Sequence, residues 1–399
     1  MSRVLLLPRT PEPLPEGVVR GARVGLAPRV SRRNNTLPRP DAAPGRGHRA
    51  VTIRSGASRS HRLRVSANTF SIGSVWKALL LGLGAVALSL SAAGASAPIP
   101  PSPVAASSTL SFTFVDPTRP TPCTGSSSRT LHVTVVTPSA PAPSPVVLVG
   151  PGSGASQTAV AVADATALAA RGYVGIGLSF PCTNAPGLST NDPTVALDIY
   201  RQPGDVSFIL SKLLTKSGTP GDALAGLLDP QRIGFVGTSS GAVTGLLLFN
   251  TCCDDARIRA MEIIKGFPVP TSPGLPVTGV YDWTRPIATY LWNGCLDLVT
   301  PYDPAASAFA QLGPPKALVT DPTGTHATPP TFPAGTTDAF LDRFVAGVTS
   351  PTTAAPFLAA NGDPYFSYDL GDGVGSHPAT AGCPASPTGP IPLTPNFTG

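Results

Sequence analysis

The chain has 399 residues and a formal net charge of +6, with 28 lysines and arginines against 22 aspartates and glutamates. Residues 1–70 contain fourteen of the basic residues and only three acidic ones, whereas the chain from Pro98 onward has thirteen basic and nineteen acidic residues, a net charge of −6. An acidic chain repels phosphate, so this composition excludes nucleic-acid binding by the larger part of the protein.

The first 97 residues have the composition of a targeting segment. Residues 1–76 are rich in arginine, and we expect them to be disordered, to lie upstream of the true start, or to act as a transit peptide. Residues 77–97 are apolar and end in small residues, which predicts a secretory signal peptide, with a membrane anchor as the alternative. A Pro/Ser-rich linker follows at 98–108.

These segments predict a secreted or cell-envelope protein. An uncleaved anchor would instead give a membrane-anchored extracytoplasmic protein with no other membrane contact, and a genuine N-terminal extension would give an organelle-targeted one. All six cysteines lie after residue 97, and an even number in an exported chain indicates disulfides. Six cysteines allow 15 pairings, so spacing alone does not choose among them.

Residues 109–348 alternate between expected strands and helices. The strands are expected at 110–115, 130–136, 145–149, 173–180, 232–236, 260–264, 286–292 and 316–319, and the helices at 158–170, 192–214 with a break at Pro203, 242–249, 305–312 and 337–348. This order predicts an α/β fold with a mostly parallel central sheet of about eight strands and helices on both faces. The connection 266–285 is too short for a large cap domain. The Pro/Gly-rich residues 349–399 are expected to wrap the domain as a tail.

The sequence GTSSG at 237–241 is a G-x-S-x-G motif between an expected strand and an expected helix. A turn this tight requires Gly237 and Gly241, because a Cβ at either position would strike the neighbouring strand or helix. Ser239 is then lifted clear of the sheet edge, and the first N–H groups of the helix point to where negative charge would develop. A Gly/Ser turn can match the motif by chance, but the flanking elements favour a nucleophile elbow.

A serine hydroxyl becomes a good nucleophile when a histidine removes its proton and a carboxylate orients that histidine. His326 follows the last expected strand by a few residues, at the carboxyl edge of the sheet where ligands bind. The other two histidines of the exported part are less suitable, since His132 lies inside a strand and His377 lies in the tail.

The acid is less determined by position. Asp297 follows the strand that ends at residue 292, while Asp303, Asp321 and Asp282 remain alternatives. A Gly-rich turn at 150–155 could bring backbone N–H groups to an anion, but it lacks the spacing of a nucleotide-binding motif. We expect no cofactor, and no metal site because zinc-ligand spacings are missing.

Three motifs in this order resemble the α/β-hydrolase superfamily: D-P-x-R-I-G at 229–234, G-x-S-x-G around Ser239, and G-x-x-D-x-x-x-P at 294–301 before His326. Over roughly 105–348 the chain is most similar to the uncapped serine esterases related to dienelactone hydrolases, platelet-activating-factor acetylhydrolases and cutinase-like polyesterases. The resemblance implies that Ser239 is the nucleophile, His326 the general base and then acid, and Asp297 the orienting carboxylate.

The resemblance also implies an oxyanion hole made by the backbone N–H groups of Ser153 and Ser240. The family topology further implies a disulfide between Cys123 and Cys182. The chain departs from the family pattern at Thr238, where histidine is usual. Pro151 replaces a loop histidine, and Ser239 replaces the cysteine of true dienelactone hydrolases, so dienelactone chemistry is not expected.

Taken together, these observations predict an exported serine hydrolase that cleaves small-molecule, lipid or polymeric carboxylic esters through an acyl-enzyme. Two alternatives stay open. An acyltransferase would use the same residues and pass the acyl group to an alcohol. A non-catalytic binding module would have kept the fold alone.

Overall fold

The computed structural model of the protein describes residues 108–271, 277–373 and 375–384, all within one compact unit. The expected N-terminal extension 1–76 and signal segment 77–97 lie outside the described residues, as does the linker apart from residue 108. Within the described ranges, no helix has both the length and the apolar character needed to cross a membrane.

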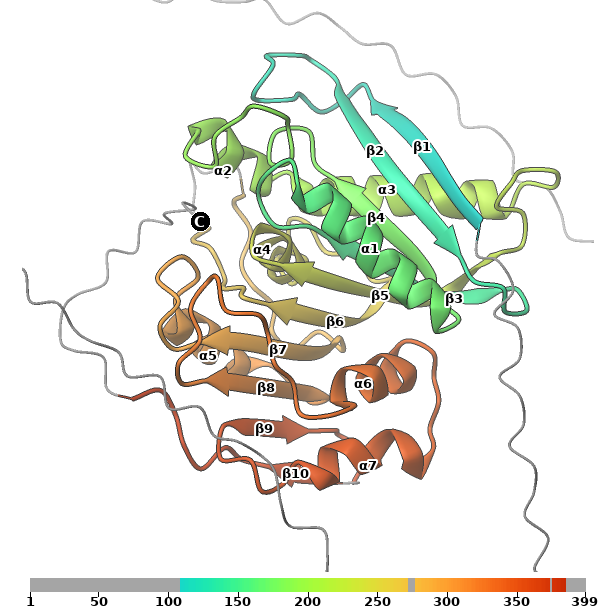
Figure 1. The fold of residues 1–399 in the computed structure, drawn as a ribbon. Helices are drawn as coiled ribbons and strands as arrows, with labels where there is room; N and C mark the ends of the chain where they lie inside the picture. Colours follow the sequence, from blue (N-terminus) through green and yellow to red (C-terminus); the bar gives the residue numbers. More distant parts are fainter. Residues whose placement is uncertain (1–107, 272–276, 374, 385–399) are drawn as a thin grey trace, which may run out of the picture. The chain divides into compact units, whose positions relative to one another are not determined.

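The described residues contain ten strands, which form one mixed sheet in the order β1-β2-β4-β3-β5-β6-β7-β8-β9-β10 (Figure 1). The strands are β1 (Ser108–Asp116), β2 (Arg129–Thr137), β3 (Ser144–Gly150), β4 (Val174–Ser179), β5 (Leu228–Thr238), β6 (Ile258–Ile264), β7 (Ala288–Gly294), β8 (Lys316–Asp321), β9 (Phe366–Asp369) and β10 (Ser376–His377). The six central strands, from β4 to β8, are parallel to one another, whereas β1, β2, β9 and β10 pair antiparallel.

The expectation of about eight mostly parallel strands is therefore corrected to ten strands in a mixed sheet. The two additional strands, β9 and β10, have four and two residues, too few to show an alternating pattern in a Pro/Gly-rich segment. β9 joins the sheet through aromatic packing, since Phe366 and Phe357 both lie about 6 Å from the ring of Tyr290. Within the segment expected to wrap the domain, Phe366–Asp369 and Ser376–His377 therefore extend the sheet.

Helices cover both faces of the sheet. They are α1 (Gln157–Ala170), α2 (Pro193–Ile199), α3 (Gln202–Ser217), α4 (Ser240–Leu247), α5 (Tyr302–Gln311), α6 (Thr336–Phe344) and α7 (Pro351–Ala359). Successive residues of the fully buried strand β3 face opposite cores: Val146 and Leu148 pack with α3 and α4, whereas Val147 and Val149 pack with α1. Such two-sided burial explains why β3 is a continuous apolar run without polar alternation.

The six cysteines form three pairs at disulfide distance: Cys123–Cys182, Cys252–Cys253 and Cys295–Cys383. The first is the pair that the family resemblance implies. The third joins the last described segment, residues 375–384, to the turn after β7. Disulfides persist in oxidising compartments, so the three pairs are compatible with an extracellular protein.

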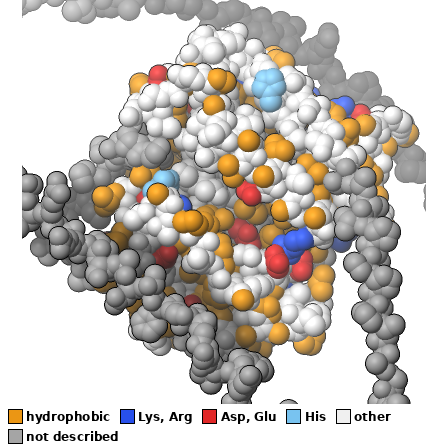
Figure 2. All heavy atoms as spheres, in the orientation of Figure 1, with side chains coloured by type: hydrophobic (Ala, Val, Ile, Leu, Met, Phe, Trp, Pro, Cys, Tyr) orange, Lys and Arg blue, Asp and Glu red, His pale blue; other side chains and the backbone are white. Residues whose placement is uncertain are grey.

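The face drawn in Figure 2 carries few charged side chains, with hydrophobic ones scattered among uncharged atoms.

One buried carboxyl group makes the stability of the fold depend on pH. Glu262 in β6 is 6% exposed, and its Oε1 atom has no hydrogen-bond partner among the described residues. Burial raises the pKa of this carboxyl to about 8, and nearby Asp338 adds to the increase against the opposing effect of Arg171. The side chain is therefore neutral in the folded protein at neutral pH.

We expect Glu262→Gln to weaken the pH dependence of stability. Because the folded pKa lies above the ordinary value of 4.5, the contribution of Glu262 is complete below about pH 4.5 and is lost as pH rises toward 8. In thermal and urea unfolding between about pH 5 and pH 9, the free energy of unfolding should fall with rising pH more steeply for the unmodified protein than for the variant. The difference should reach up to about 1.4 kcal/mol per pH unit. The exposed Asp303→Asn is the matched control. Equal pH slopes for the unmodified protein and Glu262→Gln would contradict this account.

Candidate active site

The serine of the G-x-S-x-G motif occupies a strained bend between β5 and α4. Ser239 has φ 55° and ψ −118°, a left-handed conformation that side-chain-bearing residues rarely adopt. The bend is held on both sides: Ser239 N–H donates to the carbonyl of Ile264 on β6 at 2.9 Å, and its own carbonyl accepts from Val243 N–H at 3.0 Å. The hydroxyl consequently faces out of the sheet edge.

The two glycines expected for the nucleophile elbow, Gly237 and Gly241, allow this bend because helix α4 lies against the sheet backbone. A Cβ added at Gly241 would lie 2.0 Å from the carbonyl oxygen of Gly150 on β3, and a Cβ added at Gly237 would lie 2.4 Å from the carbonyl oxygen of Gly241. Both distances are far below van der Waals contact. The contacts of the fold therefore explain why both positions are glycine. A Cβ at Gly241 would strike strand β3, whereas a Cβ at Gly237 would strike the backbone of Gly241 in the same motif.

His326 lies within hydrogen-bond distance of both other residues expected to form a triad. Ser239 Oγ is 2.9 Å from His326 Nε2, and His326 Nδ1 is 2.8 Å from Asp297 Oδ2. They follow β5, β8 and β7, whose carboxyl ends lie at the same edge of the sheet (Figure 1). The loops after three parallel strands thus bring together residues 87 and 29 positions apart.

The alternative candidates lie elsewhere. Asp303 is in the first turn of α5, Asp321 accepts from the N–H of Thr323, and Asp282 accepts from the N–H of Thr284. His132 lies in β2 and His377 in β10, and neither is paired with a carboxylate in the described part of the chain.

The carboxylate of Asp297 is stabilised in its ionised form. Burial of this side chain would raise its pKa, but hydrogen bonds from His326 and from the N–H and hydroxyl of Thr300 outweigh burial and lower the pKa below its usual value. Val299 N–H also donates to Asp297, at 2.9 Å. Because an ionised carboxylate only accepts hydrogen bonds, Nδ1 of His326 carries the proton and donates it. The Nε2 lone pair is then free to accept the Ser239 hydroxyl proton.

The glycine-rich turn 150–155 lies beside the serine. A Cβ at residue 152 would lie 3.4 Å from Ser239 Cβ, and Ser153 lines the same pocket. Within the described residues, no acceptor pairs with the Ser153 N–H. Ser240 begins α4, so its N–H has no partner within the helix. Two donors expected from the family resemblance are therefore close to Ser239.

One side chain that the sequence did not single out holds this turn. Asn184 donates from Nδ2 to the carbonyls of Gly152, at 2.8 Å, and Gly154, at 3.1 Å, while its Oδ1 accepts from Phe180 N–H at 2.9 Å. Asn184 is 5% exposed. A single buried amide thus fixes the carbonyls on both sides of Ser153. Its only signal in the sequence is its position just after the strand expected at 173–180, at the carboxyl edge of the sheet.

Lys265 is a second residue that sequence reasoning missed. It follows β6, has φ 57°, and donates from Nζ to the backbone carbonyl of His326 at 2.6 Å. Burial lowers the pKa of this ammonium group, and the negative charge of Asp297 partly opposes that decrease. This hydrogen bond therefore links the loop that carries His326 to the end of β6, the strand next to β5.

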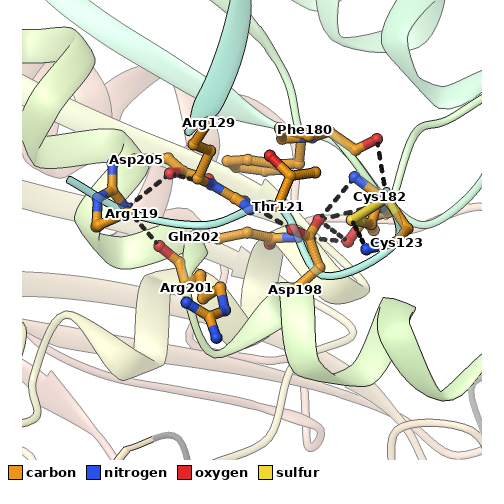
Figure 3. Close-up of polar contacts among 12 residues, drawn as sticks. Arg119, Thr121, Cys123, Arg129, Phe180, Cys182, Asp198, Arg201, Gln202 and Asp205 are labelled. Atoms are coloured by element: carbon orange, nitrogen blue, oxygen red, sulfur yellow. Dashed lines mark hydrogen bonds and ion pairs between the residues drawn. A yellow bond between two sulfur atoms is a disulfide. The ribbon is translucent and has the colours of Figure 1, made fainter. Parts of the chain in front are cut away.

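A buried charge cluster supports the loop that carries Asn184 (Figure 3). Arg129 pairs with Asp198 at 2.7 Å and with Asp205 at 2.5 Å, and all three side chains are fully buried. Arg119 adds a second ion pair to Asp205 at 2.8 Å. Buried ion pairs do little for net stability, but removing one partner leaves an uncompensated charge, so the cluster allows one arrangement only.

Hydrogen bonds connect this cluster to helix α4, which follows Ser239. Asp198 accepts from the N–H groups of Cys182 and Thr183, at 3.2 and 2.9 Å, and from the Thr183 hydroxyl. Gln202 donates to that hydroxyl at 2.7 Å and accepts from the hydroxyl of Thr244 on α4. The Cys123–Cys182 disulfide closes the same region. The loop beside the glycine-rich turn is therefore bonded to α4 as well as to β2.

A pocket of about 620 Å³ opens above the serine. Its lining comprises Gly152, Ser153, Gln157, Thr190, Thr238, Ser239, Lys265, Leu296, Leu298, Val299, Thr325, His326 and Ala327. Polar groups surround the serine, while the acid loop contributes apolar side chains. Between β6 and β7 the described residues form no helix that could cap it. In the part of the chain that the structure describes, no three His, Cys, Asp or Glu side chains are grouped to hold a metal ion.

Comparison with known proteins adds little about activity. No protein-family model and no curated protein matches the chain. Among solved structures, a ferulic acid esterase from Streptomyces cinnamoneus is similar at 20% identity with a TM-score of 0.45, over 64% of this chain and 94% of that one. A likeness of this size does not determine what this chain acts on.

The contact between α4 and β3 predicts a strong response to one added methyl group. Gly241→Ala should lower the free energy of unfolding by about 3 kcal/mol or more, because the new Cβ would displace backbone and not a flexible side chain. Gly313→Ala is the control, since a Cβ there meets nothing within 4 Å. It should change stability by less than about 1 kcal/mol. Urea unfolding measures both, and equal effects would show that the helix does not approach the strand this closely.

Proposed function

We propose that this protein is an exported serine hydrolase of the α/β-hydrolase fold that cleaves carboxylic esters through an acyl-enzyme intermediate. The observation that carries the proposal is the continuous hydrogen-bonded series from Ser239 Oγ through His326 to the buried Asp297. The strained backbone at Ser239 supports it, because such strain is retained where the surrounding structure holds a reactive side chain in place.

In the first half of the reaction, Ser239 Oγ attacks the ester carbonyl carbon while His326 Nε2 takes its proton. The imidazolium that forms is stabilised by the Asp297 carboxylate. The carbonyl oxygen becomes an oxyanion and accepts hydrogen bonds from the N–H groups of Ser153 and Ser240. Collapse of this tetrahedral intermediate breaks the C–O bond, and His326 gives its proton to the departing alcohol, which leaves an acyl group on Ser239.

In the second half, a water molecule takes the place of the alcohol. His326 Nε2 removes a proton from the water as it attacks the acyl carbon, and the same backbone donors receive the oxyanion. Collapse of the second intermediate returns the proton to Ser239 Oγ and releases the carboxylic acid. No cofactor enters the reaction. Water as the acceptor gives hydrolysis, whereas an alcohol in the same place would give acyl transfer.

Export is part of the same proposal. The apolar segment 77–97 has the pattern of a signal peptide, and the three cysteine pairs suit an oxidising compartment. Ester substrates of an exported enzyme would be small molecules, lipids or polymers outside the cytoplasm.

Replacing the nucleophile tests the reaction class. Ser239→Ala should lower kcat for a p-nitrophenyl ester by on the order of a thousandfold or more and abolish labelling by a fluorophosphonate probe. Ser126→Ala, in an exposed turn, should leave both unchanged. A folded, unmodified protein that is not labelled while a control esterase reacts would refute the proposal. Ester formation with an added alcohol in place of acid release would identify a transferase.

Asn184 tests the oxyanion side of the site. Asn184→Ala removes the donor that holds both carbonyls next to Ser153, so kcat should fall roughly ten- to a hundredfold with KM changed by much less. Asn191→Ala, an exposed asparagine in the same loop, is the control. Circular dichroism confirms that both variants fold. An unchanged kcat in the folded Asn184 variant would show that Ser153 needs no such support.

A further inference from the structure

A second pocket adjoins the one above the serine. It has a volume of about 430 Å³ and lies between the segment after β6, the segment before β7 and helix α5. Its lining comprises Phe267, Pro268, Val269, Pro270, Thr271, Tyr281, Trp283, Leu298, Val299, Pro301, Pro304, Ser307, Ala308 and Gln311. The two pockets share Leu298 and Val299.

The shared residues belong to the loop that carries the triad carboxylate. Asp297 is 3% exposed, whereas the next residue, Leu298, is 79% exposed. The backbone of this loop is fixed, since the N–H groups of Val299 and Thr300 both donate to Asp297 at 2.9 Å. A short, rigid apolar wall therefore separates the second pocket from the reacting serine, and a ligand could pass over it.

The lining of the second pocket suits an apolar ligand. It contains no Asp, Glu, Lys, Arg or His among the described residues, and four of its residues are prolines. Tyr281 and Trp283 stack with ring centroids 4.8 Å apart, and the Tyr281 hydroxyl is already used, donating to the Val269 carbonyl at 3.0 Å. Rings held in this way offer flat hydrocarbon surface at little entropic cost. Pockets of this composition bind hydrocarbon and aromatic groups.

We propose that the second pocket binds the non-reacting apolar part of an ester substrate, which extends from Ser239 across Leu298. The proposal rests on the esterase function proposed above and narrows the substrate class to esters with a long aliphatic chain or an extended aromatic group. Continuity with the proposed catalytic pocket is what assigns this occupant. A short ester would fill the first pocket only and gain nothing from the second.

A charged side chain in the second pocket tests this assignment. Ser307 lies on the exposed side of α5 and lines the pocket, so Ser307→Glu should fold and place a carboxylate among apolar groups. The kcat/KM for p-nitrophenyl laurate should fall roughly tenfold or more, since each methylene that loses its burial costs about fourfold. The kcat/KM for p-nitrophenyl acetate should not change. Ala310→Glu, on the same helix and outside the pocket lining, should affect neither ester.

A second variant and a second substrate series complete the test. Leu298→Ser should reduce the gain in kcat/KM along a series of esters with rising acyl length. If the alcohol part occupies the pocket, the reduction should appear along a series of rising alcohol length instead. Aryl esters of matched size identify an aromatic occupant. Equal losses on short and long esters in both series, or no loss with Ser307→Glu on the long esters of either series, would overturn the second pocket while leaving the esterase proposal intact. If the unmodified protein hydrolyses no ester at all, the esterase proposal itself is wrong.

Discussion

The close packing of helix α4 against strand β3 is the constraint on which the rest of the site depends. The two backbones approach so closely at Gly150 and Gly241 that no side chain fits between them. This approach forces Ser239 into a left-handed conformation and points its hydroxyl out of the sheet. The conformational cost, of order 1–3 kcal/mol, is offset by the surrounding core, because every residue of α4 is buried. The proposed nucleophile thus lies where packing, not local preference, determines the backbone.

Two separate sets of contacts hold the partners of that serine. On one side, the buried pairs of Arg129 and the Cys123–Cys182 bond hold the loop whose Asn184 amide fixes the glycine-rich turn. On the other side, Lys265 binds the His326 carbonyl. The Cys295–Cys383 bond lies two residues before the carboxylate Asp297 and joins it to the last described segment of the chain. Both sets of contacts hold backbone that carries a proposed catalytic or binding group. Such contacts keep that group in the geometry that a reaction requires.

The parts of the structure that follow from local sequence were predictable, and the parts that depend on distant contacts were not. The strand-turn-helix around Ser239 could be predicted because its spacing and its glycines, Gly237 and Gly241, lie within a few residues. The strands β9 and β10 could not, since β9 pairs with β8 and packs its Phe366 ring against Tyr290, more than seventy residues earlier, and β10 pairs only with β9. Asn184 and Lys265 were missed for a related reason: both bind backbone carbonyls of residues 30 or more positions away, and a carbonyl has no sequence signal.

The loop 297–300 connects the chemistry of the site with the shape of its surroundings. Its buried carboxylate orients His326, while the exposed Leu298 beside it forms the wall between two pockets. Because Val299 and Thr300 donate to the same carboxylate, the wall cannot shift without loosening the hydrogen bonds that orient the histidine. Pocket shape can therefore change through side chains at 298 and along α5, whereas the backbone of the loop is constrained by its hydrogen bonds to Asp297. An apolar substrate would be recognised by a surface that the triad itself keeps rigid.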